Sequence, residues 1–378
     1  MLKKLLLLSL IVIPFYEVIL YFLIPSRNYP SFVDMRVTKD FMASLFAIAI
    51  GAGVLSTNGF KKITNIWIPI FLLFIVFNIY KAPATSLHYD GIWNYQPAYQ
   101  MFVYYFLFLG VKNMTLTKQD IQSIYKTIFY CGFAMSILMM IQRLGLDQIF
   151  IVQLQSASDA TKLPQMGGSL GQATLSSPFI VMCLPFAIEQ RKWLIGAFMA
   201  IVVILSGSSF AMAGLCAIII MTIILKTKHK VVYLCSLALT LGTFIYFNQD
   251  FLCANGRFAV WNLVVKDIFN GKIAFTGAGI GAFKYLFAMK NGNTWHQAHN
   301  EYLQLLWSCG IIGFGIVAMI TKHIIKEISI SKTILISILG ISIISFGTFP
   351  LQLAVYQYYL AVMIGVAYSF GGINDFRV

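Results

Sequence analysis

Two histidines, an asparagine and a glutamate lie close together in TWHQAHNEYLQLLWSCGIIGFG, residues 294–315, where a long apolar run begins. His299 could act as a general acid or base, because an imidazole near neutral pH takes a proton from a hydroxyl and passes it on. Asn300 could orient that ring or a sugar. The spacing leaves a structural alternative equally open, in which both residues cap a helix that begins near Glu301.

His296 and His299 lie three residues apart, so they could share one face of a helix and bind a metal ion. Zinc peptidases with the H-E-x-x-H motif use a four-residue spacing, and Glu301 is the only evident third ligand nearby. We therefore predict neither a metal ion nor another cofactor, and we count His296 among the residues that contact substrate.

The longest polar segment of the chain, residues 249–299, precedes this stretch. Within it, NGRFAVWNLVVKDIF places Arg257 and Trp261 four residues apart, followed by apolar residues at helical spacing. This pattern indicates an amphipathic helix on a membrane surface. The glycine-rich FTGAGIGAF, residues 275–283, lacks the G-x-G-x-x-G spacing and the preceding strand of a nucleotide site. We interpret it as a turn that lets the backbone approach something closely.

The composition favours a membrane protein, because 59% of the 378 residues are hydrophobic and only 11% are charged. A soluble domain typically carries about 25% charged residues, so this chain has too little polar surface to face water. The net charge of +14 could indicate nucleic acid binding. In a membrane protein, Lys and Arg instead accumulate in cytoplasmic loops, and we therefore expect membrane lipids but no nucleic acid as partners.

Apolar runs predict an all-α polytopic fold with about twelve transmembrane helices in one membrane domain, residues 1–378. Helices are required because an open sheet would leave backbone groups unpaired in lipid. Charges are expected to be nearly absent from the spans apart from Glu17. The predicted spans are roughly residues 5–24, 41–56, 63–80, 97–111, 121–141, 173–189, 192–206, 208–225, 231–248, 300–320, 333–349 and 352–371.

Clusters of Lys and Arg fall on alternate connections between these spans, and such clusters normally lie in the cytoplasm. Both termini are therefore predicted to be cytoplasmic. The segment 249–299 then becomes a large outer loop that carries the candidate active site.

In this order, the residues resemble the O-antigen ligase family, which includes related O-antigen polymerases and the bacterial oligosaccharyltransferases that modify proteins. The central likeness is His299, Asn300, Leu303 and the GIIGFG run at 310–315. A second likeness is GGSLGQATLSSPFIVMCLPF, residues 167–186, which resembles the start of the family's sixth span. Upstream, the likeness extends to Arg257, Trp261, Gly277, Gly279 and Phe283.

The resemblance implies a helical fold related to the lipid-dependent glycosyltransferases of the GT-C architecture, with an active site that faces the periplasm from a bacterial inner membrane. Such enzymes transfer a glycan from undecaprenyl pyrophosphate to an acceptor hydroxyl without a metal. Arg257 would bind pyrophosphate oxygens bidentately, with Lys284 and Lys290 as weaker helpers. His299 would activate the acceptor or donate to the phosphate, and Trp261 would contact substrate.

One position departs from the family pattern, in which a Ser-Arg pair at the outer start of the eighth span helps to hold pyrophosphate. Here the stretch reads LSGSSFAMAGL and offers Ser208 and Ser209 without an arginine. Hydroxyls and N–H groups at a helix N-terminus can receive an anion, so these serines are candidates for that role. Arg143, Arg27 or Arg36 is the alternative substitute for the missing arginine.

The sequence leaves the acceptor open between the lipid A core, a protein side chain and the growing glycan. We favour a ligase that acts on the lipid A core, because the histidine–asparagine pair is more typical of ligases. A polymerase and a protein O-oligosaccharyltransferase are the alternatives within the family. A polysaccharide or lipid transporter, or flippase, is the alternative from another class. No repeated halves are evident and charges within the spans are scarce, which disfavours a transporter.

Overall fold

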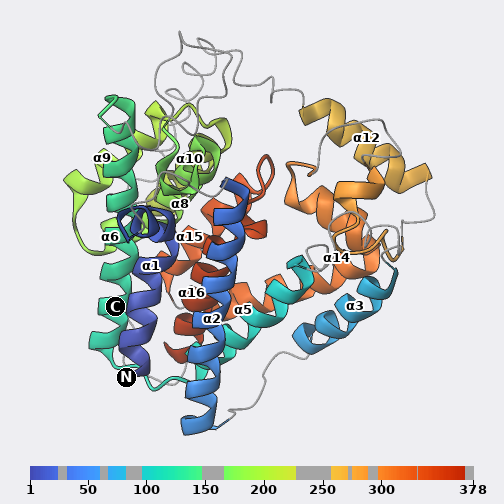
Figure 1. The fold of residues 1–378 in the computed structure, drawn as a ribbon, viewed down its shortest axis with the longest axis horizontal. Helices are drawn as coiled ribbons and strands as arrows, with labels where there is room; N and C mark the ends of the chain where they lie inside the picture. The colour runs from blue at the N-terminus through green and yellow to red at the C-terminus, as the bar shows by residue number, and fades with distance from the viewer. Residues whose placement is uncertain are drawn as a thin grey trace.

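The computed structural model describes residues 1–23, 32–59, 67–81, 96–146, 166–226, 257–270, 275–287, 297–329 and 331–370. These residues form twelve α-helices and no strand, which confirms the predicted all-helical class (Figure 1). The α-helices are α1 (Leu2–Leu23), α2 (Phe32–Asn58), α3 (Trp67–Lys81), α5 (Gln96–Asn113), α6 (Lys118–Arg143), α8 (Ala173–Glu189), α9 (Trp193–Leu205), α10 (Ser209–Lys226), α12 (Arg257–Asn270), α14 (Glu301–Ile328), α15 (Lys332–Ile344) and α16 (Ala354–Phe370). Three short turns of helix join them: η2 (Gly168–Leu170), η4 (Phe283–Phe287) and η5 (Pro350–Gln352).

Three of these helices contain stretches long and apolar enough to cross a membrane, namely Lys39–Asn58, Lys118–Arg143 and Glu301–Ile328. Shorter apolar helices of 10–17 residues accompany them, among them α8, α9 and α15. Each predicted span except residues 231–248 overlaps a helix, and that range lies outside the described residues. The number of spans and their orientation in a membrane remain predictions.

Most of the helices stand side by side in one bundle, and α3, α12 and α14 lie to one side of it (Figure 1). Tyr356, Tyr358 and Tyr359 on α16 are among the largest side chains that the bundle buries completely. The hydroxyl of Tyr358 donates to Ser9 Oγ at 2.6 Å, and the other two donate to main-chain oxygens on α8 and α1. A buried phenol needs such partners, and these bonds connect α16 to both helices.

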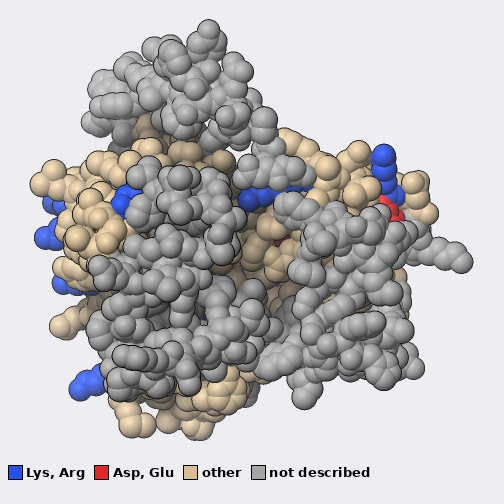
Figure 2. Space-filling model, turned by 45° about the horizontal axis from the view of Figure 1, so that its top comes forward, with Lys and Arg blue, Asp and Glu red and all other residues tan. Residues whose placement is uncertain are grey.

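On the face drawn in Figure 2, more basic than acidic side chains are visible.

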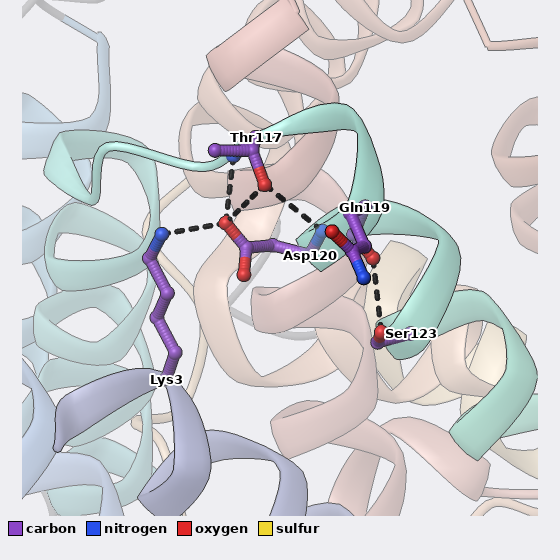
Figure 3. Close-up of polar contacts among 5 residues, drawn as sticks. All are labelled: Lys3, Thr117, Gln119, Asp120 and Ser123. Carbon is purple, nitrogen blue, oxygen red and sulfur yellow. Dashed lines mark hydrogen bonds and ion pairs between the residues drawn. The ribbon is translucent and has the colours of Figure 1, made fainter.

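One end of the bundle collects helix ends that the sequence predicts to be cytoplasmic. Lys3 Nζ lies 2.5 Å from Asp120 Oδ2, which ties the start of α1 to the start of α6 (Figure 3). Thr117 caps α6, because its hydroxyl accepts from Asp120 N at 3.2 Å while Asp120 Oδ2 accepts from Thr117 N at 2.8 Å. The hydroxyls of Tyr125 and Ser331 share a hydrogen bond of 2.9 Å, which brings the start of α15 to the same level.

The helix α2 begins at Phe32, well before the predicted start of its span, and it carries Lys39 and Asp40 into the interior. These two side chains are only 5% and 6% exposed, and Lys39 Nζ donates to the main-chain oxygen of Ser169 at 3.3 Å. Both residues precede the predicted span 41–56, and the expectation that charges are nearly absent from the spans apart from Glu17 stays a prediction. A helix tolerates charges where polar groups of the interior pair with them. The side chain of Glu17 itself lies outside the described residues.

The long helix α14 is interrupted at Gly310, whose backbone is not helical (φ 63°, ψ −172°). The non-helical segment 275–279 lies against this interruption, and the N–H of Gly279 donates to the main-chain oxygen of Ser308 at 2.9 Å. The contact lies about 10 Å along α14 from its first residue. Part of the segment 249–299, predicted as an outer loop, therefore runs alongside the first half of α14.

Replacing Gly277 by alanine is expected to lower the apparent Tm by about 2–6 °C, because overpacking of a rigid contact costs about 1–3 kcal/mol and the left-handed backbone adds about 1–2 kcal/mol of strain. Gly277 has φ +74°, and a Cβ there would lie 2.1 Å from the main-chain oxygen of Ser308. Gly315 on the same helix is the matched control, because no atom lies within 4 Å of a Cβ at that position. Thermal unfolding of both alanine variants in detergent tests this contact, and equal Tm values would contradict it.

Candidate active site at the start of α14

The helix α14 begins with a side-chain cap. Asn300 Oδ1 accepts from Tyr302 N at 3.1 Å and from Leu303 N at 3.0 Å, and Asn300 has the extended backbone of an N-cap residue. Asn300 is 6% exposed. Its oxygen therefore serves the helix, which is the structural alternative raised by the sequence. A contact between Asn300 and a substrate would have to use the amide nitrogen.

His299 has an unusual backbone conformation for a residue with a side chain, with φ 48°. This left-handed conformation costs a residue other than glycine about 1–2 kcal/mol. Hydrogen bonds on both sides hold it in place: Trp261 Nε1 donates to Ala298 O at 2.9 Å, and Glu301 N donates to Ser345 O at 2.9 Å. Strain that the surroundings impose in this way is concentrated at functional sites. The strained backbone is therefore a second reason, independent of the imidazole chemistry, to regard His299 as a candidate functional residue.

Arg257 is the first residue of α12, and its side chain reaches the connection between α15 and α16. Nη1 donates to the main-chain oxygen of Gly347 at 2.7 Å, and the guanidinium carbon lies 5.2 Å from the centroid of the Phe210 ring. Gly347 packs directly on that ring, because a Cβ there would lie 2.0 Å from it. The hydrogen bond uses one of the five N–H groups of the guanidinium. Arg257 is thus held by a backbone oxygen on one side and an aromatic face on the other.

The imidazole of His299 lies close enough to Arg257 for the charge of the guanidinium to act on it. Burial, and to a lesser degree that charge, lowers the pKa of His299 to about 4. Both effects disfavour the imidazolium, so His299 is neutral at pH 7. Its ring packs edge-on against Phe349, with 5.1 Å between ring centroids. A neutral imidazole has one ring nitrogen that can accept a proton.

Two further hydrogen bonds tie the start of α14 to α15 and to the connection that follows it, which contacts both His299 and Arg257. Gln352 Nε2 donates to Glu301 Oε2 at 3.1 Å, and the hydroxyl of Tyr302 donates to the main-chain oxygen of Ser342 at 2.7 Å. Because Phe349 and Gly347 belong to the same connection, these bonds fix the positions of His299 and Arg257 relative to each other.

The predicted amphipathic helix is present as α12, and its apolar face is buried. Val260, Val264 and Ile268 pack in one cluster with residues 282–287 and α14. Trp307 Nε1 on α14 donates to Asp267 Oδ2 at 2.7 Å within the same interface. The apolar face that the sequence pattern predicts therefore packs against other parts of the protein. Whether the outward face of α12 rests on a membrane remains a prediction.

Three aromatic rings, those of Phe210, Phe258 and Trp261, pack together at the start of α12. The ring centroid of Trp261 lies 5.1 Å from that of Phe258 and 6.5 Å from that of Phe210. The only donor of Trp261, its indole N–H, binds Ala298 O, so this residue attaches α12 to the segment before α14. Phe258 is 56% exposed.

Ser208 and Ser209 stand at the start of α10, next to Phe210 in the chain and therefore near Arg257. Ser208 is 3% exposed, and its main-chain oxygen accepts from Met212 N at 2.9 Å as α10 begins. The structure thus places these serines next in the chain to a ring that contacts Arg257, and their role in binding an anion stays a prediction. Arg143 is different, because it ends α6, whose principal contacts are with α1, α8 and α9.

The remaining predicted residues cannot be placed in the site. Lys290, His296 and Arg27 lie outside the described residues, as do the side chains of Lys284 in η4 and Arg36 in α2. Within the part of the chain that the structure describes, no three His, Cys, Asp or Glu residues are grouped so that they could hold a metal ion.

Phe210, Gly347 and Phe349 belong to the site but are not singled out as site residues by the sequence. They reach Arg257 and His299 from α10 and from the connection between α15 and α16. Phe210 has one sequence signal, since it directly follows the serines at the position where the family pattern has arginine. The other two have none, because a glycine and a phenylalanine in a short connection are unremarkable.

No protein-family model matches the chain, and no curated protein sequence matches it.

Proposed function

We propose that this protein transfers a glycan from undecaprenyl pyrophosphate to an acceptor hydroxyl at the outer face of a bacterial inner membrane. The proposal depends above all on one observation: Arg257 and His299, which are distant in the sequence, lie within electrostatic reach of each other. A cation that can bind phosphate then stands beside a neutral base, at the end of an apolar helix. The resemblance to O-antigen ligases supports the same activity.

In this transfer, the bond between the anomeric carbon and the pyrophosphate oxygen breaks, and the anomeric carbon bonds to the acceptor oxygen. The pyrophosphate leaves with the electron pair of the broken bond. Arg257 would offset the resulting charge through guanidinium N–H groups other than the one bound to Gly347 O. His299 would accept the proton that the acceptor hydroxyl loses. The lowered pKa of His299 favours this base role over donation from an imidazolium to phosphate.

A ligase that acts on the lipid A core, a polymerase and a protein O-oligosaccharyltransferase share this chemistry and differ in the acceptor. An assay with purified protein in lipid nanodiscs would offer each acceptor in turn, together with a fluorescent undecaprenyl-pyrophosphate glycan and excess EDTA. We expect transfer to one class of acceptor, measured by the mass of the product. Failure with every acceptor, or loss of transfer upon addition of EDTA, would count against the proposal.

The pH dependence of kcat/KM is expected to extend far towards acid. Because the pKa of His299 is lowered to about 4, the ring remains a neutral base as the pH falls below 7, and activity declines only as the pH approaches that value. A histidine with the ordinary pKa of about 6.5 would already lose activity below pH 7. Initial rates measured across this range, with tryptophan fluorescence as a control for folding, test the prediction. An acid limb with its midpoint near the ordinary value would contradict it.

A transporter of lipid-linked glycan is the second candidate function, because two features of the fold favour it. Lys39 and Asp40 are buried charges in α2, and Gly310 interrupts α14 beside the non-helical segment 275–279. Buried charges and interrupted helices are frequent in transporters. Movement of a fluorescent lipid-linked glycan across vesicle membranes, unaffected by loss of His299, would support this function over transfer.

A further inference from the structure

A second group of polar side chains lies far from His299, where α5, α14 and α16 approach their C-terminal ends. It consists of Lys112, His323, Glu327 and Tyr368, and we refer to these four residues as the inner cluster. All four side chains are half-buried. The proposed transfer reaction makes no use of them.

The ring of Tyr368 is the centre of the inner cluster. Lys112 Nζ lies 5.3 Å from the centroid of this ring, and the His323 ring lies 6.3 Å from it, centroid to centroid. Phe108 packs edge-on against Tyr368 with 5.3 Å between centroids. Glu327 interacts electrostatically with both Lys112 and Tyr368. Three helices therefore direct polar groups to one place.

Two polar atoms of the inner cluster are buried without a hydrogen bond. His323 Nε2 and the hydroxyl oxygen of Tyr368 have no partner among the described residues. Leaving such a group unpaired costs about 1–3 kcal/mol, so a partner for both is expected. Each can donate a hydrogen bond, and the ammonium of Lys112 lies beside them. Donors and a positive charge that converge in this way suit an anionic oxygen.

The position of His323 along α14 indicates where such an anion could come from. At 1.5 Å per residue, His323 lies about 33 Å from Glu301 along the helix, close to the ~30 Å thickness of the hydrocarbon core. If Glu301 stands at one membrane boundary, His323 stands at the other, where lipid phosphates lie. Lys322 and Lys326 are exposed on the same turns of α14 and add positive charge there.

We propose that the inner cluster binds the phosphate group of a phospholipid headgroup, through the imidazole of His323, the hydroxyl of Tyr368 and the ammonium of Lys112. Lys322 and Lys326 attract anionic lipid to the site from the membrane surface. Glu327 lies beside Lys112 and offsets part of its charge, which leaves the three lysines in excess over one carboxylate. This site is independent of the proposed transferase activity, because it lies at the opposite end of α14.

The test uses the full-length protein in maltoside detergent. Its apparent Tm is measured with dioleoylphosphatidylglycerol, with dioleoylglycerol, which has the same chains and no phosphate, and with inorganic phosphate. We expect phosphatidylglycerol alone to raise the Tm, by about 2–5 °C at saturation. An equal rise with dioleoylglycerol would mean that only the chains bind, and would overturn the proposal. A rise with inorganic phosphate alone would overturn the lipid as the source of the phosphate.

Variants locate the effect within the inner cluster. Tyr368→Phe keeps the ring that contacts Lys112 and Phe108 but removes the hydroxyl, and His323→Phe keeps a ring without its nitrogens. Both should lose most of the lipid-dependent rise. Tyr105→Phe on α5 is the matched control, because it removes another buried hydroxyl without a partner among the described residues, two turns of helix from Lys112.

The quantity compared is the lipid-dependent difference in Tm of each protein, so a lower basal Tm in a variant does not obscure the result. Native mass spectrometry of the same samples counts the phospholipid that stays bound, and we expect Tyr368→Phe to retain less than Tyr105→Phe. A full lipid-dependent rise in both inner-cluster variants would overturn the proposal.

Discussion

Replacing His299 by alanine is expected to reduce glycan transfer by about 10²–10⁴-fold, the contribution typical of a positioned general base. The reason lies in the state of the ring: burial and the charge of Arg257 keep it neutral at pH 7, so a nitrogen is available to accept the proton of the acceptor hydroxyl. Loss of the ring should lower kcat more than it raises KM, because the proton moves only in the transition state.

The backbone of His299 allows loss of chemistry to be distinguished from loss of structure. Because its φ of 48° strains most residues other than glycine, His299→Gly should relieve that strain and keep or raise the Tm while activity is lost. His299→Asn tolerates the same conformation and keeps a polar side chain without a base. Transfer by the asparagine variant at the rate of the unaltered protein would exclude His299 as the base.

The helices could be predicted from the sequence because apolar runs reflect burial directly. Each predicted span that the structure describes overlaps a helix, although the span predicted at 333–349 runs past the end of α15 at Ile344 into the connection that contains Gly347 and Phe349. The amphipathic pattern at 255–269 reappears as α12. The start of α2 could not be predicted in this way. Lys39 and Asp40 end the apolar run, although the fold supplies interior partners such as Ser169 O that permit the helix to continue through them. Such a partner, distant in the chain, leaves no local pattern.

Some residues of the candidate site could likewise be predicted from the sequence, and others could not. Residue types and spacing single out Arg257, Trp261 and His299, because their chemistry is visible one residue at a time. Their partners are not visible in this way: Gly347 contributes only a main-chain oxygen and a face without a side chain. The glycine-rich segment is an intermediate case. Its composition predicts a close backbone approach, and only the fold identifies the interruption of α14 as the surface approached.

Replacing Arg257 by lysine is expected to reduce transfer by about 10²–10³-fold, although the formal charge is kept. The guanidinium binds Gly347 O with one N–H while its central carbon lies 5.2 Å from the centroid of the Phe210 ring, so it is held from two sides before substrate arrives. A lysine has no second donor in a fixed fork. It cannot hold the main-chain oxygen and present two parallel N–H groups to a departing pyrophosphate at the same time.

Arg191→Lys is the matched control for this prediction, because Arg191 is exposed at the connection between α8 and α9, far along the chain from the site, and should tolerate the change. Steady-state kinetics decide what Arg257 does. A lower kcat means that Arg257 stabilises charge on the leaving group, whereas a higher KM with unchanged kcat means that it only binds the donor. If neither parameter changed, the guanidinium would serve to attach α12 to the connection between α15 and α16. The pyrophosphate would then need another cation, and the lysines near 284–290 would be the first to test.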